Sequence, residues 1–130
     1  MMEVLVVDDD ALMRGMLAEW LAEAGYRVRE AENGTKALQM LRIRPADLLI
    51  SDMDMPGRDG AQTIDEARRM LPGLTVIAIS GGARDERQNW KAKALKLGAA
   101  KALAKPFERR DLLAAVKELM PQDKSGARQA

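Results

Sequence analysis

The sequence predicts an α/β fold built on a doubly wound, five-stranded parallel sheet. Five short apolar runs alternate with amphipathic segments, and this alternation is typical of successive β–α units. The run Leu48–Ile50 is apolar without a break, as in a strand that is buried on both faces. A length of 130 residues, 47% of them hydrophobic, fits one globular domain with its own core.

The first half of the chain supplies two β–α units before this central strand. Val4–Val7 is the first predicted strand, and the helix after it ends at Gly25. Tyr26–Ala31 alternates weakly, which indicates a short strand near an edge of the sheet. Asn33-Gly34 turns into a second helix, which ends before Pro45 because proline disfavours helical geometry in the residue before it. The apolar stripe of the first helix consists of Leu12, Met13, Met16, Leu17, Trp20, Leu21 and Ala24.

The second half of the chain completes the pattern after the central strand. Its predicted elements are, in order, a helix over about 61–70, a strand over 76–79, a charged helix over about 85–97, a short strand over 102–104 and a last helix that ends before Pro121. We expect residues 1–120 to form the domain and residues 121–130 to form a flexible polar tail.

The order of the strands decides which residues meet. Right-handed crossovers leave few ways to wind five such units, and the flavodoxin-like order 2-1-3-4-5 is the commoner one. This order places the first and third strands side by side, where the winding reverses. Asp8 and Asp9 follow the first strand, and Asp52 ends the third. We therefore expect these distant carboxylates to lie together at the edge where open α/β sheets bind ligands.

The composition excludes several classes of chemistry. The chain has no cysteine, which excludes disulfides and thiolate catalysis, and no histidine, which excludes a phosphohistidine donor and histidine-ligated zinc. A net charge of +1 gives no reason to expect nucleic acid as a partner. The first residues lack the pattern of a signal peptide, and no apolar run is long enough to span a bilayer. We therefore expect a cytoplasmic protein with no membrane partner.

Carboxylates gathered in one crevice repel one another unless some are protonated or a cation lies among them. A set of carboxylates, a backbone carbonyl and water suits Mg²⁺, which often binds jointly with phosphate. Asp8, Asp9 and Asp52 therefore predict a site for Mg²⁺ and a phosphoryl group. The alternative is that each aspartate caps the helix after its strand, a role that we assign to Asp10 alone.

Two further residues follow strands on the same rim. Ser80 ends the fourth strand and offers a hydroxyl donor, and Lys105 follows the fifth strand and offers an ammonium group. Taken alone, Ser80 would be explained as a helix cap and Lys105 as a solvated surface residue. Because both groups suit the stabilisation of a transferred phosphoryl group, their shared position makes them candidates for that chemistry.

Four motifs occur in a specific order. They are Val-Val-Asp-Asp at 6–9, Ser-Asp-Met-Asp-Met-Pro-Gly-Arg-Asp-Gly at 51–60, Ile-Ser-Gly-Gly at 79–82 and Lys-Pro-Phe at 105–107. With these motifs the chain resembles the receiver domain of two-component response regulators, in its single-domain chemotaxis-type form. The resemblance covers about residues 3–120.

The resemblance implies a set of residue roles. Asp52 would accept a phosphoryl group from a histidine kinase or a histidine phosphotransfer protein, and the acyl phosphate would later hydrolyse. The domain would thus be a phospho-acceptor and not an enzyme with an external substrate. Asp9, Asp52 and the backbone carbonyl of Asp54 would bind Mg²⁺, with Asp8 acting largely through water. Ser80 and Lys105 would engage the phosphoryl group, and Lys105-Pro106 would be a cis peptide.

The resemblance also implies an output face, with one departure from the family pattern. An unknown downstream protein would bind the face formed by the fourth helix, the fifth strand and the fifth helix. The domain would be a monomer or a weak phosphorylation-dependent dimer. The family usually has an aromatic switch residue where this chain has Ala102. Gly81 and Gly82 would instead allow the loop after the fourth strand to change its backbone conformation on phosphorylation, because glycine tolerates conformations that other residues avoid. Trp90 is either a packing residue, which we favour, or a partner contact.

Three alternatives remain at the level of sequence. Asp52-Met-Asp54 resembles the nucleophile motif of haloacid dehalogenase-like phosphatases, but Pro56 stands where that family has a hydroxyl or small branched residue. A degenerate receiver that serves only as a binding module is a second alternative, against which the intact set of acidic residues, Ser80 and Lys105 argues. A receiver that forms part of a longer multidomain regulator is a third.

Overall fold

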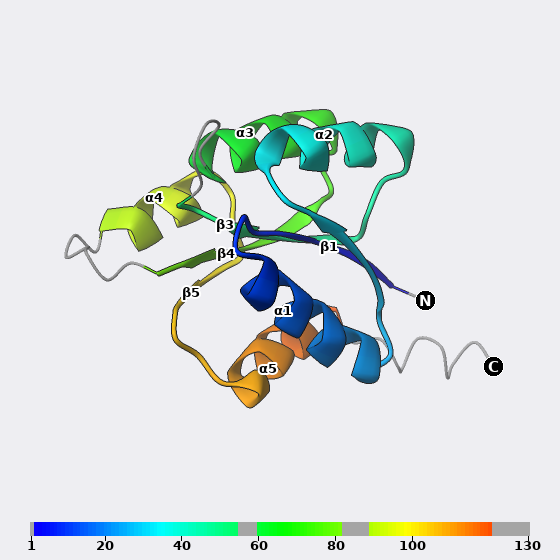
Figure 1. The fold of residues 1–130 in the computed structure, drawn as a ribbon. Coiled ribbons are helices and arrows are strands. Elements are labelled where there is room, and N and C mark those ends of the chain that lie inside the picture. The colour runs from blue at the N-terminus through cyan, green and yellow to red at the C-terminus, as the bar shows by residue number, and fades with distance from the viewer. Residues whose placement is uncertain (1, 55–59, 82–88, 121–130) are drawn as a thin grey trace.

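A computed structural model describes residues 2–54, 60–81 and 89–120, and this part of the chain forms one five-stranded parallel sheet in the order β2-β1-β3-β4-β5 (Figure 1). In the register, Val6 lies beside Ile50, and Ile50 lies beside Ile77. The predicted fold class and strand order are confirmed, and β2 is an edge strand as expected. The strands are β1 (Glu3–Val7), β2 (Arg27–Ala31), β3 (Leu48–Asp52), β4 (Thr75–Ser80) and β5 (Lys101–Ala104).

Helices cover both faces of the sheet. Figure 1 shows α2, α3 and α4 on one side of the strands and α1 and α5 on the other. This is the doubly wound arrangement that alternating β–α units produce when every crossover is right-handed. The helices are α1 (Ala11–Glu23), α2 (Gly34–Ile43), α3 (Gly60–Met70), α4 (Asn89–Lys96) and α5 (Arg109–Leu119).

The sheet separates two apolar clusters, because successive side chains of a strand point to opposite faces. Leu5 and Leu49 belong to the cluster under α2 and α3, and Val6 and Ile50 belong to the cluster under α1 and α5. Leu48, Leu49 and Ile50 are all fully buried, as expected for the central strand. Trp90 packs against the first of these clusters, so the packing interpretation of this residue is supported.

Local signals in the sequence place the ends of the helices. The carboxylate of Asp10 accepts hydrogen bonds from the backbone N–H groups of Leu12 and Met13, at 3.0 and 3.3 Å, and so caps α1 as predicted. Gly98 follows α4 with φ of +109°, a conformation that favours glycine. The described part of α4 begins at Asn89, and the predicted start near residue 85 lies outside the described residues, as does the predicted tail at 121–130.

The apolar stripe predicted for α1 is wider than the face that the helix buries. Leu17 and Leu21 are fully buried, but Leu12 is 84% exposed and Met16 is 38% exposed. Leu12 and Met16 form one row along the helix, and Leu17 and Leu21 form the neighbouring row, which packs against the sheet. The apolar stripe therefore includes one row, Leu12 and Met16, that the core does not bury.

Gly15 lies in the middle of α1 in open space. No neighbouring atom lies within 4 Å of the position that a Cβ would take. Because glycine in a helix interior is less stable than alanine, we expect Gly15→Ala to raise the free energy of unfolding by roughly 0.5–1 kcal/mol. Urea denaturation followed by circular dichroism would measure the change. Gly98→Ala is the contrasting control, because its Cβ would overlap the side chain of Arg68 and should lower the free energy of unfolding. A lower free energy of unfolding for Gly15→Ala would contradict the expectation.

Candidate functional site

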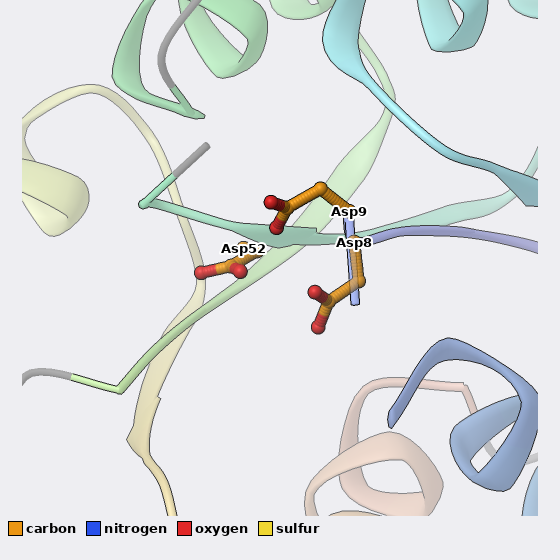
Figure 2. Close-up of side chains that lie close together, drawn as sticks. All are labelled: Asp8, Asp9 and Asp52. Carbon is orange, nitrogen blue, oxygen red and sulfur yellow. The ribbon is translucent and has the colours of Figure 1, made fainter. Parts of the chain in front are cut away.

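Three carboxylates meet at the carboxyl ends of β1 and β3. Asp8 and Asp9 follow β1, Asp52 ends β3, and one carboxylate oxygen from each lies within 4.8 Å of the others (Figure 2). Asp8 is fully buried and Asp52 is 3% exposed, whereas Asp9 is exposed. The pairing of β1 with β3 brings these residues together, as the strand order predicted from the sequence requires.

The environment of Asp52 opposes its ionisation. Burial raises the pKa of the Asp52 carboxyl from 3.8 to about 7, and the nearby charge of Asp8 adds to the rise. A hydrogen bond from the backbone N–H of Asp54 and the ammonium of Lys105 act in the opposite direction. A second cation beside this carboxylate would therefore be needed to keep it fully ionised at neutral pH.

Lys105 reaches the carboxylates from the end of β5. Its Nζ lies 3.1 Å from Oδ2 of Asp8 and 3.4 Å from Oδ2 of Asp52. Burial lowers the pKa of Lys105, but the charges of Asp52 and Asp8 outweigh this effect and raise the pKa above its ordinary value of 10.5. The backbone N–H of Lys105 donates to the carbonyl of Ser80 at 2.8 Å, and the Lys105-Pro106 peptide is cis, as the resemblance implied. Lys105 is therefore a fixed positive charge beside Asp52.

Ser80 and Asp54 form a contact that no sequence motif predicts. The hydroxyl of Ser80 donates to Oδ2 of Asp54 at 2.7 Å, and the backbone N–H of Asp54 donates to Oδ1 of Asp52 at 3.0 Å. Ser80 is 2% exposed, and Asp54 is exposed. Among the described residues, the carboxylate of Asp54 is not part of the group formed by Asp8, Asp9 and Asp52. The side chain of Asp54 thus contacts Ser80, while its predicted role as a ligand concerns only its backbone carbonyl.

Arg14 is a residue of this region that the sequence reasoning missed. Its Nη1 donates to the backbone carbonyl of Asp8 at 2.9 Å, and its Nε pairs with Glu30 at 3.1 Å. It thereby ties the loop after β1 to α1 and β2. The available signal was a single charged residue one turn after the helix cap, between apolar positions on either side.

Gly60 closes the motif at 51–60, but the sequence reasoning assigned it no role. A Cβ at this position would overlap the backbone of Asp52 and Met53. The N–H of Gly60 donates to the carbonyl of Met53 at 3.3 Å, so α3 begins directly against the end of β3. The available signal was a glycine at the predicted start of a helix. Glycine is required at such a position when another part of the backbone lies too close for a side chain.

The donor set fits Mg²⁺. All three side chains offer hard oxygen ligands, one carboxylate is exposed to solvent, and the charges of the cluster exceed the single positive charge of Lys105. Mg²⁺ retains several water ligands, which suits a site that is open on the side of Asp9. A divalent cation there would offset the repulsion between Asp8 and Asp52.

Comparison with known proteins agrees with this geometry. The family model described as "Response regulator receiver domain" matches residues 4–117. The chain belongs to this family. The receiver domain is 33% identical to the Chemotaxis protein CheY of Halobacterium salinarum over 118 residues, which cover 91% of this chain and 96% of that protein. It is 36% identical to the Transcriptional regulatory protein PdtaR of Mycobacterium tuberculosis, covering 87% of this chain but 54% of that protein.

Solved structures extend the similarity to the fold. The chemotaxis protein CheY4 of Vibrio cholerae superposes on this receiver domain with a TM-score of 0.84 and 28% sequence identity, covering 92% of this chain and 99% of that one. The receiver domain thus spans nearly all of some relatives and about half of others. Within the described ranges, no helix combines the length and the apolar character needed to cross a membrane.

Proposed function

We propose that this receiver domain accepts a phosphoryl group on Asp52 from the phosphohistidine of a histidine kinase or of a histidine phosphotransfer protein. The observation that carries the proposal is the setting of the Asp52 carboxylate. It is buried at a strand end, pairs with Lys105 at 3.4 Å and lies beside the carboxylates of Asp8 and Asp9. A carboxylate so placed has a fixed cation on one side and ligands for a second cation on the other.

The transfer conserves bonds and electrons. An oxygen of the Asp52 carboxylate bonds to phosphorus as the bond between phosphorus and the imidazole nitrogen breaks, and the nitrogen keeps the electron pair. Water later adds to phosphorus, the bond to Asp52 breaks, and inorganic phosphate leaves with the carboxylate regenerated. The domain is thus a phospho-acceptor that resets itself and not an enzyme with an external substrate.

The neighbouring residues have separate roles in this proposal. Lys105 offsets negative charge on the phosphoryl oxygens, and Ser80 donates its hydroxyl to one of them. Asp8, Asp9, Asp52 and the backbone carbonyl of Asp54 are the residues that would hold Mg²⁺, with Asp8 acting largely through water. When bound, Mg²⁺ supplies positive charge that neutralises the transferred group.

The proposal extends to the rest of the domain. Residues 1–120 act as the receiver in the cytoplasm, and phosphorylation changes the face formed by α4, β5 and α5, which a downstream protein reads. The proposed partner of that face is a protein, and the net charge of +1 gives no reason to add direct contact with nucleic acid or membrane. The oligomeric state in this proposal is a monomer or a weak dimer that phosphorylation favours.

Phosphate-affinity gel electrophoresis tests the assignment of Asp52. With acetyl phosphate and Mg²⁺ we expect wild-type protein to show a slower band, and we expect no slower band for Asp52→Asn or in the presence of EDTA. Asp47→Asn is a matched control, since Asp47 immediately precedes β3, at the opposite end of that strand from Asp52. A shifted band that persists in Asp52→Asn would place the phosphoryl group on another residue.

A further inference from the structure

We infer that Asp54 is a positioning residue whose carboxylate holds the hydroxyl of Ser80 until a phosphoryl group on Asp52 competes for it. The inference rests on the proposed function and deepens it, because it adds a role for the side chain of Asp54. The proposed role of this residue in binding Mg²⁺ involves only its backbone carbonyl.

The geometry makes Asp54 a bridge between two strand ends. Its backbone N–H donates to Asp52 at the end of β3, and its carboxylate accepts from Ser80 at the end of β4. The distance of 2.7 Å from Ser80 Oγ to Asp54 Oδ2 is that of a well-formed hydrogen bond from a hydroxyl to an oxygen acceptor. Ser80 is almost fully buried, so this hydrogen bond is shielded from competing water.

A serine hydroxyl carries one proton and can donate it to one strong acceptor at a time. Donation to a phosphoryl oxygen on Asp52 therefore ends donation to Asp54. Hydrogen bonds to charged groups are stronger than those between neutral groups, so releasing Ser80 has an energetic cost that the phosphoryl group must offset. Donation to Asp54 and donation to the phosphoryl group thus exclude each other.

The surrounding strands connect this exchange to β5. The carbonyl of Ser80 accepts from the N–H of Lys105, and Ser80 lies beside Ala104 in the register of β4 with β5. Ala102 lies beside Ala78 in the same register and has only a methyl side chain. Residue 102 therefore has no aromatic side chain that could change position on phosphorylation. In this inference the free and phosphorylated proteins differ instead in which group accepts the hydrogen bond from Ser80.

Beryllofluoride, a mimic of the phosphoryl group, tests the inference. Its apparent affinity at saturating Mg²⁺ would be followed by tryptophan fluorescence. We expect Asp54→Ala to raise this affinity about ten-fold, the size of effect expected from losing one hydrogen bond to a charged acceptor. Asp54→Asn keeps an oxygen acceptor without the charge and should give a smaller rise. Asp10→Asn, which removes a charge from the same rim and retains a helix cap, should give little change.

A double-mutant cycle separates the hydrogen bond from simple charge repulsion. In a Ser80→Ala background, Asp54→Ala should leave the affinity for beryllofluoride unchanged. An equal rise with and without Ser80 would overturn the inference, because the carboxylate would then act only by repelling the anion. Failure of the proposed function is distinguishable, since wild-type protein would then not bind beryllofluoride at all.

A measurement on the free Asp54→Ala variant keeps the inference testable if Ser80→Ala binds beryllofluoride too weakly. The amide of Lys105, which donates to the carbonyl of Ser80, would be observed by nuclear magnetic resonance. In the free Asp54→Ala protein we expect its chemical shift to move toward the value of the wild-type beryllofluoride complex. An unmoved resonance would mean that Asp54 does not restrain Ser80, and the inference would be wrong.

Discussion

Replacing Gly60 with alanine is expected to lower the free energy of unfolding by about 3 kcal/mol or more and to abolish phosphorylation of Asp52. The added Cβ would overlap the carbonyl oxygen of Asp52 and the Cα of Met53. These are backbone atoms of the strand end that carries the phospho-acceptor, so they cannot turn aside as a flexible side chain would. Either α3 moves outward or the end of β3 is displaced, and both changes disturb the site.

Urea denaturation and the phosphate-affinity gel would measure the two effects of Gly60→Ala. Gly73→Ala is the matched control, because Gly73 lies just beyond the other end of α3 and no atom lies within 4 Å of the position of its Cβ. We expect little change in stability or phosphorylation for this variant. If Gly60→Ala were as stable as Gly73→Ala, the close approach of α3 to β3 would not be a constraint on the fold.

Replacing Asp52 with asparagine is expected to stabilise the Mg²⁺-free protein at alkaline pH by up to about 4 kcal/mol. The carboxyl has a pKa of about 7 in the folded protein and an ordinary value of 3.8. Between these values the folded state binds the proton more tightly than the unfolded chain. Wild-type stability should therefore fall as pH rises from about 4 to 7, and this contribution is absent in Asp52→Asn. Lys105 retains Asp8 as a partner in the variant.

Denaturation of both proteins in EDTA across pH 4 to 8 would measure this difference. We expect the curves of wild type and Asp52→Asn to meet near pH 4, to separate steadily from pH 4 to 7 and to stay at a constant separation above about pH 7. Adding Mg²⁺ at pH 8 should stabilise wild type and narrow the gap, because the cation binds the folded state and offsets the carboxylate charges. A gap that is equal at all pH values would show that burial of Asp52 does not determine the stability difference.

The features that depend on the path of the backbone could be predicted from the sequence. The apolar runs and their turn residues predicted each strand of the described residues. The rules for right-handed crossovers then left few orders for the sheet, and the commoner of these is the one observed. Asp8, Asp9, Asp52 and Lys105 meet because parallel strands present their carboxyl ends at one edge. Side chains directly after strand ends are placed by topology alone, so their proximity could be predicted without knowledge of any rotamer.

The features that the sequence did not predict depend on side-chain direction. The hydrogen bond from Ser80 to Asp54 requires one rotamer of each residue, and the bridge from Arg14 to the carbonyl of Asp8 requires an extended guanidinium. No periodicity in a sequence encodes either choice. The exposure of Leu12 was not predicted either, because periodicity shows which residues share a face of a helix but not how much of that face the fold covers.

The division of the interior by the sheet has a consequence for engineering. Val4 and Val6 contact one apolar cluster and Leu5 and Val7 contact the other, so a single strand contributes to two compartments that do not share side chains. Substitutions that lie in separate compartments and more than about 7–10 Å apart should change stability additively. A laboratory could therefore randomise one compartment in a library while holding the other constant, and then combine the best solutions from each.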